Sequence, residues 1–217
     1  MKIILARHGE TQWNKLKKLQ GRLDSPLTDE GILQAHSLAE KLKTAQVKLI
    51  ISSPLKRAEH TAQICEKVLN VERQLDAQLV ERDFGLWQAE YFSELKSEKY
   101  FTDVFYKVNH QGPPDGETGI ACAQRIQQAL LNIARTQLNG IKSHLPLSNR
   151  RLSNQLQSNE LPVEGCLLVI THGDAIRCLL SLLSVQGQVD AYSQYGNGKT
   201  FPLYYHAELD ELQVLVE

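Results

Sequence analysis

Long hydrophobic runs are absent from this sequence of 217 residues. Its longest apolar stretches, Cys166 to Ile170 and Cys178 to Leu183, are far shorter than the roughly 20 residues that a membrane span needs. The run from Ile3 to Ala6 ends at Arg7, before it reaches the length of a signal-peptide core. We therefore expect no membrane partner and no export.

Cysteines are few, and their spacing shows no paired motif. The 4 cysteines are scattered without a Cys-x-x-Cys pair, and each lies in an apolar context where a reduced thiol packs as a small hydrophobic side chain. This distribution excludes a disulfide-stapled miniprotein. It favours a reducing cytoplasm as the location of the protein.

An excess of charge of either sign is also missing. Lys and Arg number 24 against 25 Asp and Glu, for a formal net charge of -1. Such a balance produces no bulk field that would attract nucleic acid, so a partner must be recognised by a local site. The sequence contains no Gly-x-x-x-x-Gly-Lys-Ser/Thr loop and no Gly-x-Gly-x-x-Gly fingerprint, and nucleotide handling is not indicated.

What is present is a regular alternation of strand and helix patterns. This alternation implies crossover connections, and it predicts an α/β fold: a three-layer α/β/α sandwich with a mostly parallel central sheet and helices on both faces. The expected elements are strands at 2–6, 47–52, 75–80 and 167–170, helices at about 28–42, 53–69, 92–106, 120–138 and 175–183, and a closing hairpin over 201–216. Ser53 as cap and Pro54 in the first helical position are expected to open the second of these helices.

We expect one domain over residues 1–217, with a polar insertion at about 139–164. The segment from Asn139 to Glu164 is rich in Ser, Asn and Gln, and it is too long for an ordinary connection between a helix and a strand. A surface insertion and a loop that binds a partner or gates a substrate both remain open.

One pattern occurs twice, and it carries the first functional signal. Buried-type strands end in Arg7-His8-Gly9-Glu10 and in Thr171-His172-Gly173-Asp174. Ligands in open α/β sheets bind outside the carboxyl ends of the strands, so both imidazoles are expected in one crevice, where glycine lets the backbone approach a ligand closely. Coincidence is the alternative for the dipeptides taken alone.

A zinc site is the competing interpretation of two such histidines. No His-x-x-x-His or His-x-His spacing supports it. Arg7 adjoins His8, and Arg57 lies just beyond the second predicted strand; guanidinium groups repel a cation and bind an oxyanion in bidentate fashion. The residues therefore predict an anion site without a metal, and phosphate is the natural anion.

Taken together, these residues resemble the histidine phosphatase (phosphoglycerate mutase-like) superfamily. The block from Leu5 to Asn14 resembles the signature of that family. Further blocks follow in family order, and these are Gln20 to Thr28, Ser52 to Ala58, Glu81 to Trp87, Gly116 to Thr118 and Thr171 to Gly173. The resemblance covers most of the chain outside 139–164.

The resemblance implies a phosphohistidine mechanism without a cofactor. His8 would take the phosphoryl group, and Glu81 would protonate the leaving alcohol and then accept a proton from the attacking water. Arg7, Arg57 and His172 would surround the phosphoryl oxygens. Asn14, Gln20, Gly21 and Gly173 would contribute to substrate binding.

Mutases and phosphatases share this core, and the segment after Glu81 separates them. The mutases carry adjacent arginines and a lysine there for a second anionic group, whereas Gln88 to His110 holds no arginine, and its three lysines and four acidic residues give a net charge of -1. The segment from Phe84 to Tyr106 is instead aromatic, and its rings are expected mostly to pack against the sheet, with one or two lining a leaving-group pocket.

A phosphomonoesterase acting on a small phosphate ester is therefore the favoured interpretation. A cofactor-dependent phosphoglycerate mutase, an α-ribazole phosphate or fructose-bisphosphate phosphatase, and a phosphohistidine protein phosphatase or phosphoprotein-binding module remain as alternatives. The oligomeric state and the leaving group are not predicted by the sequence.

Overall fold

The computed structural model describes residues 1–144, 165–184 and 195–215. A six-stranded sheet runs through its centre in the order β3-β2-β4-β1-β5-β6. The strands are β1 (Lys2–Arg7), β2 (Val47–Ser52), β3 (Arg73–Leu75), β4 (Cys166–Thr171), β5 (Thr200–His206) and β6 (Glu211–Val214). Strands β1 to β4 pair in parallel, and the β5–β6 hairpin adds two antiparallel strands beside β1.

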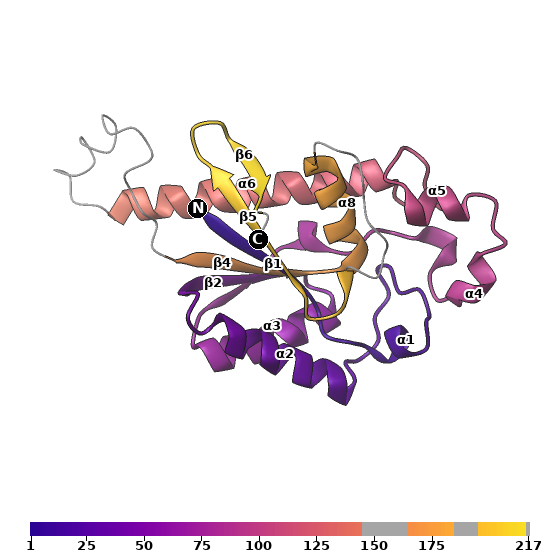
Figure 1. Cartoon of the computed structure of the whole chain (residues 1–217), viewed down its shortest axis with the longest axis horizontal. Helices are drawn as coiled ribbons and strands as arrows, with labels where there is room; N and C mark the ends of the chain where they lie inside the picture. Colours follow the sequence, from indigo (N-terminus) through magenta and orange to yellow (C-terminus); the bar gives the residue numbers. More distant parts are fainter. Residues whose placement is uncertain (145–164, 185–194, 216–217) are drawn as a thin grey trace.

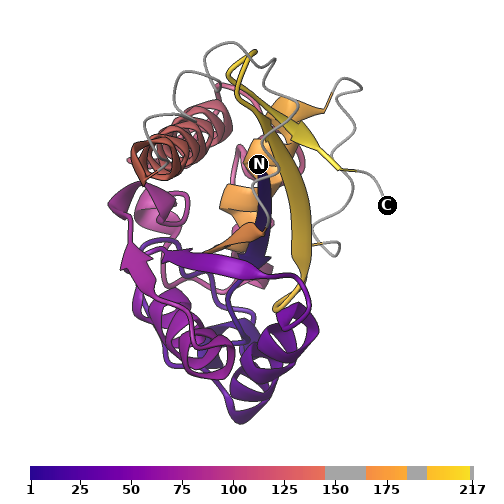
Figure 2. The ribbon, with the colours of Figure 1, turned by 90° about the vertical axis from the view of Figure 1, so that its left-hand side faces the viewer.

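Helices cover both faces of this sheet (Figures 1 and 2). Helices α2 (Asp29–Leu42) and α3 (Lys56–Leu69) lie on one face, and α6 (Gly119–His144) and α8 (Gly173–Leu183) lie on the other. The three-layer α/β/α sandwich with a mostly parallel sheet is thus confirmed. The short helices α1 (Gln12–Lys15), α4 (Phe92–Leu95) and α5 (Phe101–Tyr106) gather beyond one end of the sheet, at the right of Figure 1.

Alternation along the strands builds a separate core on each face. In β4, Leu168 and Ile170 pack with α2 and α3, whereas Leu167 and Val169 pack with α6 and α8. All four are buried, because successive side chains of a strand point to opposite faces and a parallel sheet is covered on both. Within the described residues, no helix is long and apolar enough to cross a membrane.

Several predicted elements differ from the structure, and two of them differ most. The third strand ends at Leu75, where the prediction has it begin, because the Asp76 carboxylate accepts the Gln78 backbone N–H at 2.7 Å and starts a 3₁₀ turn, Ala77–Leu79. The predicted helix over 92–106 is two short helices, since Ser97 Oγ donates to the Glu94 carbonyl at 2.9 Å where α4 has ended.

The start of α3 also differs. The helix begins at Lys56, and Ser53 and Pro54 precede it. Its first N–H groups are capped from elsewhere in the chain: the Asp24 carboxylate accepts from the backbone N of Lys56 at 2.9 Å and of Arg57 at 3.5 Å. An acceptor more than thirty residues away thus replaces the local cap that the sequence suggested.

The aromatic segment after Glu81 packs mainly on itself rather than on the sheet. Phe84, Trp87, Phe101 and Phe105 form a third buried cluster with Leu95 and Val104. The Phe105 ring stacks on Phe84 at 5.5 Å and on Trp87 at 5.8 Å between centroids. The expectation that most of these rings cover the sheet is therefore wrong.

The predicted insertion lies largely outside the described residues. Its first part, 139–144, is the end of α6, which runs six residues further than the predicted helix. Residues 145–164 are not described.

Candidate active site

The register of the sheet brings the two histidine motifs together. Arg7 at the end of β1 is paired with Thr171 at the end of β4. The next residues, His8 and His172, therefore leave the sheet side by side, and their ring centroids lie 5.2 Å apart at an interplanar angle of 61°. The two imidazoles thus lie together at the carboxyl ends of the strands, as the repeated pattern predicted, but only His8 lines the cavity described below.

His8 is held in a single tautomer by its neighbours. Its Nδ1 lies 2.7 Å from the carbonyl oxygen of Gly9, which can only accept, so Nδ1 carries the proton and donates. The Nε2 lone pair then faces Nε of Arg57, which donates to it at 3.2 Å. Burial, followed by the positive charges of Arg57 and Arg7, lowers the pKa of His8 well below its ordinary value of 6.5. The side chain is a neutral imidazole with one basic nitrogen.

Arg57 is fixed on several sides at once. Its Nη atoms donate to the carbonyl oxygens of Gly21 at 2.7 Å and Leu23 at 2.6 Å, and to the Asp24 carboxylate at 2.8 Å. The side chain is only 1% exposed. A guanidinium locked in this way presents a fixed positive charge beside His8.

Arg7 lies against the second motif. One Nη donates to the carbonyl oxygen of Tyr195 at 2.6 Å, and its guanidinium carbon would come within 3.0 Å of a Cβ at Gly173. The glycine of the second His-Gly pair thus leaves room for the arginine of the first. Gly173 acts here through Arg7, which the sequence did not suggest.

His172 stands behind His8 and is fully buried. Its Nε2 pairs with Ser53 Oγ at 2.8 Å, and its Nδ1 has no hydrogen-bond partner within the described part of the chain. Burial, then the charges of Arg57 and His8, lowers the pKa of His172 well below 6.5. The Ser53 that the sequence suggested as a helix cap instead holds this imidazole.

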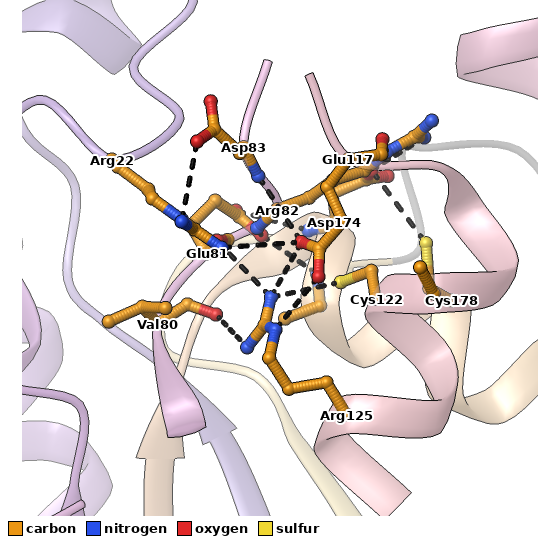
Figure 3. Close-up of polar contacts among 12 residues, drawn as sticks. Arg22, Val80, Glu81, Arg82, Asp83, Glu117, Cys122, Arg125, Asp174 and Cys178 are labelled. Atoms are coloured by element: carbon orange, nitrogen blue, oxygen red, sulfur yellow. Dashed lines mark hydrogen bonds and ion pairs between the residues drawn. The ribbon is translucent and has the colours of Figure 1, made fainter. Parts of the chain in front are cut away.

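Glu81 is held by the start of α8. Its Oε1 accepts from the backbone N of Ala175 at 2.8 Å and of Arg82 at 3.0 Å, and its Oε2 accepts from the N of Asp174 at 3.3 Å. Figure 3 shows this carboxyl in a cluster with Arg82 and Asp174. Burial, followed by the negative charge of Asp174, raises the pKa of Glu81. A carboxyl in such surroundings is suited to proton transfer.

These groups share one cavity of about 400 Å³. The predicted residues on its wall are Arg7, His8, Asn14, Gln20, Gly21, Arg57 and Glu81. Of the predicted set, His172 and Gly173 lie behind this wall. Gly21 has a φ of +55°, and a Cβ there would come within 2.3 Å of the Gln88 side chain, so the position requires glycine.

Aromatic side chains form an apolar wall of the cavity. Phe84, Phe92, Phe105 and Tyr106 all line it, more rings than the one or two expected. The high density of aromatic residues after Glu81 was the sequence signal for this aromatic lining. Which of them face the cavity depends on the break between α4 and α5, which local periodicity did not show.

Three polar residues on the cavity wall escaped the sequence analysis. Lys17 and Lys18 follow α1, and Asn197 lies before β5. Asn197 Nδ2 donates to the His8 carbonyl at 3.0 Å and to Asn14 Oδ1 at 3.3 Å, and it thus joins the end of the chain to the first motif. The Lys18 ammonium sits 4.7 Å from the Trp13 ring centroid and 5.6 Å from that of Tyr91.

The cavity therefore combines the features that an anion and an apolar group need. Arg7 and Arg57 supply fixed positive charge beside His8, and the aromatic rings supply an apolar lining. Among the described residues, no group of three or more His, Cys, Asp or Glu side chains could hold a metal ion.

Comparison with known proteins defines the class. Residues 3–144 match the histidine phosphatase superfamily (branch 1), and the chain belongs to this superfamily of phosphatases and mutases. The chain is 33% identical over 181 residues to the probable phosphoglycerate mutase GpmB of Proteus mirabilis strain HI4320, a match that spans 83% of this chain and 74% of that protein.

Solved structures share the fold. A mycobacterial glucosyl-3-phosphoglycerate phosphatase in complex with VO3 superposes with a TM-score of 0.75 at 23% identity, covering 99% of this chain and 96% of that one. The α-ribazole phosphatase from Shigella flexneri gives a TM-score of 0.71 at 22% identity, with 100% and 95% covered.

Proposed function

We propose that the protein is a phosphomonoesterase that hydrolyses a small phosphorylated metabolite through a phosphohistidine on His8. The observation that carries this proposal is the state of His8: a neutral imidazole whose Nε2 lone pair faces Arg57 on the wall of the cavity. Such a nitrogen attacks without prior deprotonation, and the covalent intermediate divides one displacement into two easier ones.

In the first step, Nε2 of His8 attacks phosphorus and the ester P–O bond breaks. The proton of the Glu81 carboxyl passes to the leaving oxygen. In the second step, water attacks the phosphohistidine, its proton returns to Glu81, and the P–N bond breaks to restore neutral His8. Glu81 suits this exchange, because its raised pKa keeps it able to donate and to accept.

Arg7, Arg57 and His172 hold the three phosphoryl oxygens in this proposal. The two guanidinium groups supply fixed charge, and His172, in ring contact with His8 behind the cavity wall, has an Nδ1 without a hydrogen-bond partner among the described residues. Asn14, Gln20, Gly21 and Gly173 complete the substrate site, directly or by shaping it. The mechanism uses no metal and no cofactor, and the four free, buried thiols suit a reducing cytoplasm.

Hydrolysis is favoured by the aromatic residues that the segment after Glu81 contributes to the cavity wall. The segment from Gln88 to His110 contributes Phe92, Phe105 and Tyr106 to the cavity, and none of its lysines lines the part that the structure describes. A half-apolar cavity with a nearly buried Glu81 also suits a small leaving group better than a phosphorylated protein, and an α-ribazole phosphate would fit that chemistry.

A phosphoglycerate mutase is the second candidate, and one observation favours it. Lys17 and Lys18 lie on the cavity wall and supply cations that the segment after Glu81 lacks. The Proteus mirabilis relative also carries a mutase name. Either lysine would pair with a second anionic group on the substrate.

The deciding experiment offers the enzyme 3-phosphoglycerate with a trace of 2,3-bisphosphoglycerate. The rate of 2-phosphoglycerate formation is compared with the rate of phosphate release from a panel of small monoesters. Hydrolysis of at least one monoester should be the faster reaction. Isomerisation faster than the best hydrolysis by about ten-fold or more would replace the phosphatase by the mutase.

A further inference from the structure

Asp174, the residue after the second His-Gly pair, is a fully buried carboxylate held by two buried arginines. Arg82 Nη1 lies 3.3 Å from its Oδ2, and Arg177 Nε donates to its Oδ1 at 2.5 Å. Asp174 and Arg82 are completely shielded from solvent, and Arg177 is nearly so. Three charged groups removed from water must have excellent mutual geometry to be tolerated, so this cluster is rigid.

The backbone N–H groups of this cluster contact the Glu81 carboxyl. The backbone N–H of Asp174 donates to Oε2 of Glu81, and the backbone N–H of Arg82 donates to Oε1. The same two residues are joined to each other by their side chains (Figure 3). The ion pair therefore locks the two backbone segments that hold the Glu81 carboxyl in place.

The cluster also reaches the aromatic wall of the cavity. Arg82 Nη1 donates to the Val104 carbonyl at 2.9 Å, and Arg177 Nη2 donates to the same oxygen at 3.3 Å. Val104 precedes Phe105, whose ring lines the cavity. The buried arginines thus tie the Glu81 carboxyl and the leaving-group wall to one support.

Charges of both signs face Glu81. Asp174 on α8 opposes ionisation of the carboxyl, and Arg57 on α3 favours it. Arg125 on α6 donates to the Glu81 carbonyl at 3.4 Å and is itself paired with Glu117. The remaining titratable or charged groups around the carboxyl are Arg7 and His8 on the cavity wall, Arg82 beside it, His172 at the start of α8, and Arg177 behind Asp174.

We propose that Asp174 is a positioning residue for Glu81: held by Arg82 and Arg177, it fixes the carboxyl through the start of α8, and its negative charge holds that carboxyl in the acid form needed to protonate an alkoxide leaving group. This inference rests on the acid–base role of Glu81 in the proposed function. A cluster that merely stabilised the fold would not affect leaving-group protonation.

The test compares two substrates of similar size, 2-phenylethyl phosphate and 4-nitrophenyl phosphate. Departure of an alkoxide needs a proton and departure of 4-nitrophenoxide does not, so the ratio of their kcat/KM values reports the protonation of Glu81. The ratio is measured across pH for the wild type, Asp174→Asn and Arg177→Gln. Asp103→Asn, which removes the same charge from an exposed site on α5, is the matched control.

The wild-type ratio falls as pH rises, because Glu81 ionises. In Asp174→Asn the fall begins at lower pH, and at about pH 7.5 the ratio is at least about five-fold below that of the wild type. In Arg177→Gln it begins at higher pH, because Asp174 then faces only Arg82. A purely structural role would not shift the pH profiles of the two variants in opposite directions. If Asp174→Asn does not fold, the shift in Arg177→Gln still tests the proposal.

Glu81→Gln separates this inference from the proposed function. It should lower the ratio at every pH and remove its pH dependence. An unchanged ratio in Glu81→Gln would overturn the acid role of Glu81 itself. The inference about Asp174 alone would be overturned if the ratio collapses in Glu81→Gln but Asp174→Asn and Arg177→Gln keep the wild-type pH profile. Shifts of the same sign in both variants would overturn it as well.

Discussion

Nε of Arg57 lies 3.2 Å from Nε2 of His8, the nitrogen that the Gly9 carbonyl leaves unprotonated. A fixed cation thus stands directly beside the only basic atom of the imidazole. Burial and this positive charge lower the pKa of His8 and keep the imidazole neutral, and in the proposed mechanism the guanidinium stands beside the oxygens of the attacked phosphoryl group. In the proposed mechanism, the nucleophile and its electrostatic support are therefore built as one unit.

Replacement of His8 by Ala should abolish catalysis. Removal of a covalent nucleophile leaves only binding and electrostatic effects, so phosphate release from an aryl phosphate should fall by at least about 10³-fold. A rapid acid-free quench should also trap a phosphohistidine in the wild type and none in the variant. His60→Ala, at an exposed position on α3, is the control and should keep full activity. A loss of only a few-fold in His8→Ala would refute the nucleophile assignment.

Gly173→Ala should impair catalysis by displacing Arg7. The new methyl group would meet the guanidinium carbon at 3.0 Å, so Arg7 must move by a few tenths of an ångström. We expect kcat/KM to fall about ten-fold with no loss of thermal stability, because alanine is the better helix former. Gly140→Ala on α6, where a Cβ has open space, should leave kcat/KM unchanged. Unaltered kinetics in Gly173→Ala would show that the contact between position 173 and Arg7 does not contribute to catalysis.

Acidification should destabilise the fold through its buried histidines. The pKa of His8 is lowered in the native state, so between that pKa and 6.5 the unfolded chain binds the extra proton and unfolding is favoured as pH falls. The raised pKa of Glu81 acts in the opposite direction, which is why a difference between variants is needed.

The measurement is the free energy of unfolding in urea at pH 7.0 and pH 5.5. On going to the lower pH, the wild type should lose up to about 1 kcal/mol more than His8→Asn does. His60→Asn, which changes an exposed histidine, should follow the wild type. Equal losses of unfolding free energy in the wild type and His8→Asn would show that the His8 imidazole has the same pKa in the folded and unfolded states.

Chelation should leave the activity intact. Two arginines occupy the place where a metalloenzyme would bring cations to the phosphate, and the described residues hold no cluster of metal-ligating side chains. Protein treated with EDTA and passed through a desalting column should retain its rate and contain no stoichiometric zinc or magnesium. Recovery of a lost activity on addition of either metal would contradict the mechanism.

The sequence came closest to the structure where the signal is local. The strands that precede His8 and His172 are short apolar runs, and Thr28, at the start of the predicted helix over 28–42, caps α2 by accepting the Gly31 N–H. Local signals failed where a distant group supplied the partner. Asp24 accepts the first N–H groups of α3 in place of Ser53, whose Oγ pairs with His172 and also accepts from the backbone N of Leu55 at 3.3 Å.

By itself, the sequence determined the class of fold through strand periodicity, and its two His-Gly motifs with Arg7 and Arg57 predicted an anion site. The assignment of Glu81 followed from the resemblance to the histidine phosphatase superfamily. Tertiary structure alone decided what surrounds these residues. Asn197 reaches His8 from 189 residues away, and Asp174 meets Arg82 across 92 residues. Such contacts depend on the register of the sheet and the packing of helices, which bring together groups with no pattern in common along the chain.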